Sequence, residues 1–289
     1  MTMSTYHSLS DSLHGVADAV KVYLSEQMGA TKIQIETAVE ELAFITPLTG
    51  SLPDFHYICV EVTDSPLRDA LEANFVQEGI RRFLPIRLFV AVPKGIVDGV
   101  FRQVEAKTRR HGLGLLEVDG ARVTPIHQAL SLSLAGVRSC DLTLVPRRYR
   151  HALTSAEQAF KNGTPVEGCK KVYEEIEAFS RRLAKATLHK GLWMGEGRPP
   201  RFFRDNWATV MQAWERRIDA QQTRRVCPKL TTVFIARIVG STPYRNLTAH
   251  KPNTRAELVE RDKQLRTRFE DACDLFGALV EAAKPLRIR

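Results

Sequence analysis

The sequence predicts two domains of different class, an α/β domain over residues 1–145 and an all-α helical bundle over residues 150–289. Helical and strand-like segments alternate in the first stretch, whereas only helical segments follow it. The charge divides in the same way, because residues 1–150 hold 16 Lys+Arg against 17 Asp+Glu while residues 151–289 hold 26 against 16. With 289 residues, of which 44% are hydrophobic, the chain is long enough for two globular cores.

The α/β prediction depends on the order of elements in the first domain. Helices are expected where apolar residues recur every three to four positions, and strands where they alternate or run continuously. The predicted helices are 10–28, 65–83 and 96–110, and the predicted strands are 32–39, 56–63, 86–92, 112–118 and 122–126. A loop is expected over residues 46–53, where two prolines and a glycine interrupt the pattern. A mixed sheet flanked by helices fits this order.

The second domain begins after a basic connector, residues 142–151, in which Pro146 marks the boundary. Its predicted helical segments are 155–188, which contains two helices, 204–220, 229–239 and 256–283. A loop is expected over residues 190–200, because three glycines and two prolines cannot continue a helix. Trp207, Met211 and Trp214 share helical spacing and are expected in the bundle core.

Composition predicts a cytoplasmic protein without a membrane segment. No apolar run approaches the roughly 20 residues that span a bilayer, and the start MTMSTYHSLSDSL lacks the features of a signal peptide. The five cysteines are widely spaced and never form a C-x2-C pair. We therefore expect reduced, mostly buried thiols and no zinc site.

Residues 244–250 (YRNLTAH) place an arginine, an amide and a histidine between two predicted helices. A histidine exchanges protons near neutral pH, and an arginine binds phosphate and stabilises the charge that develops on it. Arg245, Asn246 and His250 are therefore candidate catalytic residues for phosphodiester cleavage without a metal. On one helix Arg245 and His250 diverge by about 140°, so we expect a site shared by two subunits. The alternative is that Arg245 and Asn246 cap a helix end and His250 is a surface imidazole.

The string Arg-Asn-x-x-Ala-His resembles the R-(polar)-x3-to-5-H signature of HEPN domains, an all-helical family. Residues 155–188 resemble the opening helical pair of that family, and residues 256–283 resemble its closing helix. The resemblance implies a metal-independent endoribonuclease that works as a homodimer and needs no cofactor. It also allows a domain that has lost catalysis and serves in dimerisation or binding.

A second motif lies in the first domain, where Pro53-Asp54 precedes Glu61-Val62-Thr63 on a predicted strand. This arrangement resembles the restriction-endonuclease-like PD-(D/E)XK fold. In that family two carboxylates bind a divalent metal that activates water. A lysine two residues after the second acid helps to organise the nucleophile and to stabilise charge. Thr63 occupies the lysine position, and the interval between Asp54 and Glu61 is short for the family. The resemblance therefore favours a nuclease fold that does not cleave over an active one with Asp54 and Glu61 as Mg²⁺ ligands.

The basic excess of the second domain indicates a polyanionic partner, since Lys and Arg bind phosphates without reading sequence. The expected nucleic-acid-binding residues are Lys251, Arg224 and Arg225, with the further clusters Arg181-Arg182, Arg198-Arg201-Arg204 and Arg216-Arg217. RNA is the expected partner and DNA the alternative. A solubilising surface would show the same composition.

Together the two resemblances imply a protein of antiphage defence or abortive infection that acts alone or with a partner protein of that system. In it the helical domain cuts RNA through Arg245 and His250. Two other functions remain open. In one, the first domain is a metal-dependent DNA nuclease through Asp54 and Glu61, and the helical domain dimerises it. In the other, the chain is a non-catalytic binding or scaffold subunit of a defence complex.

Overall fold

The structure is a computed structural model that describes residues 6–39, 44–66, 73–96, 98–143, 145–161, 163–195, 198–246 and 251–288. Its contacts divide the chain into two compact units. Unit 1 comprises residues 1–137, 161–163 and 250–264, and unit 2 comprises residues 138–160, 164–249 and 265–289. Unit 1 thus includes a segment, residues 250–264, that the sequence placed in the helical domain.

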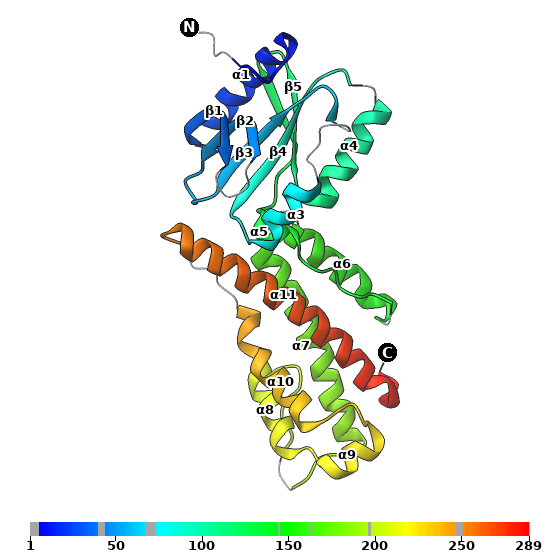
Figure 1. Ribbon diagram of the computed structural model, residues 1–289. Helices are drawn as coiled ribbons and strands as arrows, with labels where there is room; N and C mark the ends of the chain where they lie inside the picture. Colours follow the sequence, from blue (N-terminus) through cyan, green and yellow to red (C-terminus); the bar gives the residue numbers. More distant parts are fainter. Residues whose placement is uncertain are drawn as a thin grey trace. The chain divides into compact units, whose positions relative to one another are not determined.

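Unit 1 is built on a mixed six-stranded sheet in the order β1-β2-β3-β4-β5-β6 (Figure 1). The strands are β1 (Thr31–Val39), β2 (Phe44–Ser51), β3 (Tyr57–Val62), β4 (Ile86–Pro93), β5 (Gly114–Asp119) and β6 (Arg122–His127). Strands β3, β4 and β5 are parallel, while the outer pairings are antiparallel. Parallel neighbours need a crossover connection, and helices α3 (Ala73–Arg81) and α4 (Asp98–His111) lie in these two crossovers.

Helices cover both faces of this sheet (Figure 1). Helix α1 (Asp11–Glu26) packs on one face, and α3, α4 and the short α5 (Leu132–Ala135) pack on the other. Because successive side chains of a strand point to opposite faces, β4 gives Phe89 and Ala91 to the first core and Leu88 and Val90 to the second. The predicted α/β architecture of this part is confirmed at the level of a mixed sheet with flanking helices.

Strand β2 shows that the loop predicted over residues 46–53 was wrong. Thr46 and Leu48 pair with Thr37 and Ile35 of β1, so the strand continues on both sides of Pro47. On its other edge, β2 pairs with β3. Proline removes one backbone donor but leaves its neighbours able to pair, and the two flanking strands supply the partners that local sequence does not reveal.

A buried carboxylate attaches the first turns of α11 (Arg255–Ala283) to the rest of unit 1. Asp262 is fully buried, and its carboxylate accepts a hydrogen bond of 2.6 Å from the Ser133 hydroxyl. The Arg261 guanidinium lies 2.9 Å from the same carboxylate, and Nε2 of buried His56 lies 3.8 Å from it. Burial pushes the pKa of Asp262 up, but its partners His56, Ser133 and Arg261 outweigh burial and hold the pKa below its usual value.

The same network extends to Asp54, which precedes β3. Nδ1 of His56 lies 3.0 Å from the Asp54 carboxylate, and the Arg87 guanidinium of β4 lies 2.8 Å from it. Burial raises the pKa of Asp54, yet His56 and Arg87 outweigh this effect and hold it well below its usual range. Asp54 therefore serves as an ionised link between the start of β3, the start of β4 and His56.

Unit 2 is helical, as predicted. Its elements are α6 (Arg147–Lys161), α7 (Pro165–His189), α8 (Trp207–Arg217), α9 (Ala220–Val226), α10 (Thr232–Ser241), the 3-10 helix η1 (Thr242–Asn246), the later turns of α11 and the 3-10 helix η2 (Lys284–Leu286). Aromatic rings fill its core, among them Phe179 and Phe276, which pack edge to face at 5.7 Å. Trp207, Met211 and Trp214 are buried, which confirms their predicted place in the core.

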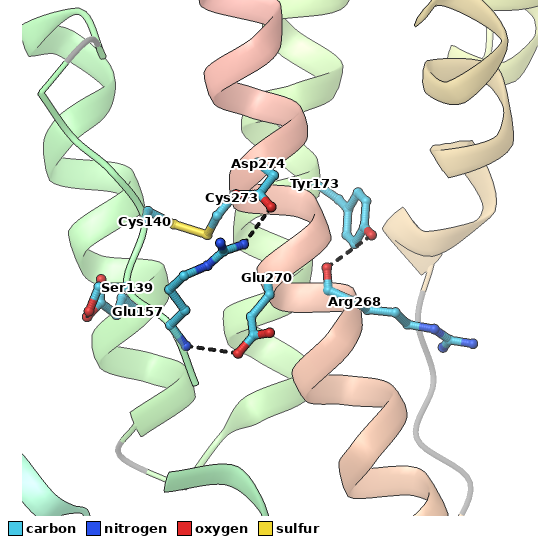
Figure 2. Close-up of a disulfide and its surroundings, with 9 residues drawn as sticks. Ser139, Cys140, Glu157, Tyr173, Arg268, Glu270, Cys273 and Asp274 are labelled. Atoms are coloured by element: carbon cyan, nitrogen blue, oxygen red, sulfur yellow. Dashed lines mark hydrogen bonds and ion pairs between the residues drawn. A yellow bond between two sulfur atoms is a disulfide. The ribbon is translucent and has the colours of Figure 1, made fainter. Parts of the chain in front are cut away.

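A disulfide joins Cys140 to Cys273 within unit 2 (Figure 2). The prediction that all five cysteines are reduced was therefore wrong for this pair, while Cys59, Cys169 and Cys227 form no disulfide and are buried. The two paired cysteines are 133 residues apart in sequence, so their spacing gave no sign of contact. Nearby, Arg138 donates from its backbone N–H to Glu270 of α11 at 3.0 Å, which fixes the same connection.

Among the residues that the structure describes, no helix combines the length and the apolar character needed to cross a bilayer.

Candidate nucleic-acid interface

Arg245 lies in η1, directly after α10, and is paired with a buried carboxylate of α7. Its Nε is 2.7 Å from Oε2 of Glu177, and Glu177 is only 8% exposed. Because 46% of the Arg245 side chain is still accessible, the ion pair fixes the guanidinium without covering it. Tyr244 holds the same turn in place, since its ring packs against Tyr173 and under the Arg268 guanidinium.

Arg181 binds the other oxygen of Glu177. Its Nε and Nη2 donate to Glu177 Oε1 at 2.8 and 2.6 Å, and its Nη1 donates to the carbonyl oxygens of Phe202 and Asp205. One buried Glu–Arg pair of α7 therefore anchors both η1 and the loop before α8. The sequence analysis missed this role of Glu177. The available signal was the spacing of Glu177 and Arg181, which stand four apart on a long helix and can pair.

The other residues of the predicted catalytic set are only partly described. Asn246 is the last residue of η1 and is exposed, and Lys251 is exposed in the segment before α11. His250 lies outside the described residues. The structure therefore places Arg245 and Asn246 together at the end of a 3-10 turn, and the predicted partnership with His250 stays a prediction.

Asp54 and Glu61, the alternative metal ligands, lie at different places along β3. Asp54 precedes the strand and contacts Arg87 and His56, whereas Glu61 is near the end of the strand, opposite Val90 of β4. A strand rises about 3.3 Å per residue, so the four steps from Tyr57 to Glu61 alone span about 13 Å. In the part of the chain that the structure describes, no group of three or more His, Cys, Asp or Glu is arranged to hold a metal ion.

Helices α8 and α9 lie at one end of unit 2 (Figure 1). Between residues 185 and 229 the sequence holds ten Lys+Arg against four Asp+Glu, so this end has a net positive charge. We call it the basic end; its exposed arginines are Arg198, Arg201, Arg204, Arg216, Arg224 and Arg225. Within the described ranges no carboxylate forms an ion pair with any of these six side chains.

Two aromatic rings lie among these cations. Phe203 is 61% exposed, and the Lys185 ammonium lies 5.6 Å from its ring centroid. Trp193 is partly exposed, and the Arg217 guanidinium lies 5.5 Å from its ring. The Arg217 side chain also donates to the carbonyl of Met194, which fixes the loop to the end of α8. The basic end thus offers accessible ring faces with positive charge beside them.

Arg224 and Arg225, predicted from their sequence cluster, belong to α9. Asp219 caps this helix, because its side chain accepts from the backbone N–H of Gln222 at 2.9 Å. The described residues show no ion pair between Asp219 and either arginine. The sequence analysis assigned no helix here, since seven residues are too few for a periodic pattern.

Comparisons of the chain with protein-family models, with curated proteins and with solved structures found no match.

Proposed function

We propose that this protein binds single-stranded nucleic acid, with RNA as its main partner, through the basic end of unit 2. The observation that carries the proposal is the exposed Phe203 ring with Lys185 beside it, among arginines that no described carboxylate neutralises. Guanidinium and ammonium groups bind phosphates, and exposed aromatic rings stack on bases. Bases are free to stack in this way only when they are unpaired, which favours a single strand.

A second proposal is that the protein cleaves RNA without a metal, through Arg245 and His250 of a homodimer. It is supported by the position of Arg245, whose guanidinium is oriented by buried Glu177 while nearly half of its side chain is accessible. In this mechanism His250 either removes the proton from a ribose 2′-OH, whose oxygen attacks phosphorus, or gives a proton to the 5′-oxygen that leaves as the P–O5′ bond breaks. Arg245 stabilises the negative charge on the phosphorane oxygens. Asn246 orients the phosphate or the imidazole. The reaction leaves a 2′,3′-cyclic phosphate and requires RNA, because DNA has no 2′-OH.

The family resemblances add a biological context to these proposals. A HEPN-like helical unit next to a restriction-endonuclease-like α/β unit fits a cytoplasmic defence protein, which acts alone or with a partner protein. The alternative of metal-dependent DNA cleavage by Asp54 and Glu61 has less support, because Asp54 is held by Arg87 and His56. A non-catalytic scaffold remains the outcome if neither Arg245 nor His250 affects any cleavage.

The binding proposal is tested by the affinity of the full chain for a labelled single-stranded RNA, measured by fluorescence anisotropy. We expect Phe203→Ala to raise the Kd about tenfold or more, since stacking contributes about 1–3 kcal/mol per base. Ile45→Ala is the matched control, because Ile45 is equally exposed, at 60%, but lies in unit 1. Equal affinities of Phe203→Ala and wild type would show that the ring does not contact the strand.

The cleavage proposal is tested with single-stranded RNA in EDTA, with the products analysed for cyclic phosphate ends. We expect wild type to cleave, and His250→Ala or Arg245→Ala to lower the rate about a hundredfold or more. Arg237→Ala is the control, since Arg237 is an exposed arginine of α10. Wild type that leaves RNA intact in EDTA, or His250→Ala as active as wild type, would remove catalysis and leave the binding proposal in place.

A further inference from the structure

An open pocket of ≈ 860 Å³ lies between α9 and the start of α10. Its volume falls within the range of about 300–1,000 Å³ that is usual for small-ligand sites. Eight residues line it, namely Ala220, Gln221, Arg224, Arg225, Pro228, Leu230, Thr231 and Thr232. Two arginines, a glutamine and two threonines therefore border one space.

The walls of this pocket are fixed by backbone hydrogen bonds. In the turn between the helices, the N–H of Cys227 donates to Thr223 at 2.7 Å and the N–H of Leu230 donates to Cys227 at 2.9 Å. Cys227 and Leu230 are buried beneath the turn. A ligand would therefore meet a formed site and would not have to order the loop at its own entropic cost.

The electrostatics of the pocket select an anion. No carboxylate lines it, and among described residues none forms an ion pair with Arg224 or Arg225. Asp219 caps α9, and Glu281 pairs with Lys229. The positive charge of the two arginines is therefore directed to solvent or to a ligand.

The hydrogen-bond donors of the pocket select a phosphate. Thr231 Oγ1 accepts from the backbone N–H of Phe234 at 3.1 Å, so its own proton remains available for a ligand. Gln221 and Thr232 add side-chain donors, and both are exposed. Planar guanidinium groups match the spacing of phosphate oxygens, which is why arginine pairs recognise this group well.

We propose that the pocket binds a phosphomonoester, either the phosphorylated end of a nucleic-acid strand or a free nucleotide. A phosphomonoester carries up to two negative charges and three acceptor oxygens, which matches two guanidinium groups and several donors. A phosphodiester inside a strand carries one charge and continues on both sides, which suits an open surface better than a pocket.

The strand-end form of this inference rests on the proposed function and is tested by comparing two RNAs of the same sequence, one with a 5′-phosphate and one with a 5′-hydroxyl. We expect the full-length protein to bind the 5′-phosphorylated RNA about tenfold more tightly. A third RNA, with a 3′-phosphate only, tells which end is bound.

The double variant Arg224→Gln/Arg225→Gln should lose the preference for the phosphorylated RNA, whereas Arg237→Gln should keep it. Glutamine has nearly the helix propensity of arginine, and a circular dichroism melt checks that each variant is folded.

The free-nucleotide form is tested by calorimetry with adenosine 5′-monophosphate and with adenosine. Binding of the monophosphate alone, abolished in the double variant, supports the pocket even if no RNA binds and the proposed function fails. Equal affinity for all three RNAs, together with no binding of the monophosphate, overturns the inference while leaving RNA binding by the basic end intact. A preference that persists in the double variant also overturns it, because the phosphate would then lie elsewhere.

Discussion

At the scale of single residues, two buried carboxylates fix the positions of segments that are far apart in the sequence. Asp262 bonds to Ser133 and contacts His56 within unit 1, and Glu177 binds Arg181 and Arg245 within unit 2. Sequence patterns indicate which residues are charged but not which partners meet in space. For this reason the sequence left Asp54 open as a metal ligand under the alternative of an active nuclease, and the structure shows it paired with Arg87.

Asp262 makes the stability of the protein depend on acid pH. Its folded pKa lies below the usual value of 3.8, so its contribution is fully present above about pH 4 and is lost as the pH falls further. We expect Asp262→Asn to lower the free energy of unfolding by about 3 kcal/mol at pH 7, since it removes the buried charge that Arg261 and Nε2 of His56 face. Urea denaturation at pH 7, 5, 4 and 3 measures both effects, and the variant should lose less stability on acidification than wild type.

Asp271→Asn is the control for this measurement, because Asp271 is an exposed residue of α11. It should match wild type at every pH. An Asp262→Asn protein with the acid dependence of wild type would mean that other carboxylates cause the loss.

At the scale of elements, periodic patterns predicted the long segments well and the short ones poorly. Helices α1 and α11 lie within two residues of their predicted ends, because many turns of apolar residues define one face. Strand β2 was not predicted because proline and glycine break its pattern, and helix α9 was not predicted because it has only 7 residues. Their structure depends on neighbouring strands and on an aspartate cap, which only the folded chain shows.

The closest approach of α6 and α7 gives a test at this scale. A Cβ at Gly168 would lie 2.7 Å from the Ala156 carbonyl oxygen and 2.7 Å from Phe160 Cβ. We expect Gly168→Ala to lower the free energy of unfolding by about 1–3 kcal/mol, because overpacking outweighs the better helix propensity of alanine. Gly277→Ala is the control, since a Cβ there meets nothing within 4 Å, and it should raise the stability by up to about 1 kcal/mol. Thermal melts of both variants measure these changes, and a stabilised Gly168→Ala would contradict the close packing.

At the scale of the whole molecule, the sequence predicted the α/β and helical parts and the location of the basic charge. It did not predict that residues 250–264 belong to the first unit or that Cys140 and Cys273 pair. Both depend on contacts across more than a hundred residues, for which local spacing carries no information. The charge could be located because composition is a sum over a segment and needs no knowledge of pairing.

The salt dependence of RNA binding shows most directly whether the basic end binds the strand. Each phosphate that the basic end contacts should contribute to a linear fall of log K with log salt, with a slope of about −0.7 per contact for a single strand. We measure the slope for wild type and for the variant Arg201→Gln/Arg204→Gln/Arg216→Gln. We expect the variant to bind more weakly, with a slope that is smaller in magnitude by about one to two. A variant with the affinity and the slope of wild type would contradict it, because the strand would then bind another surface.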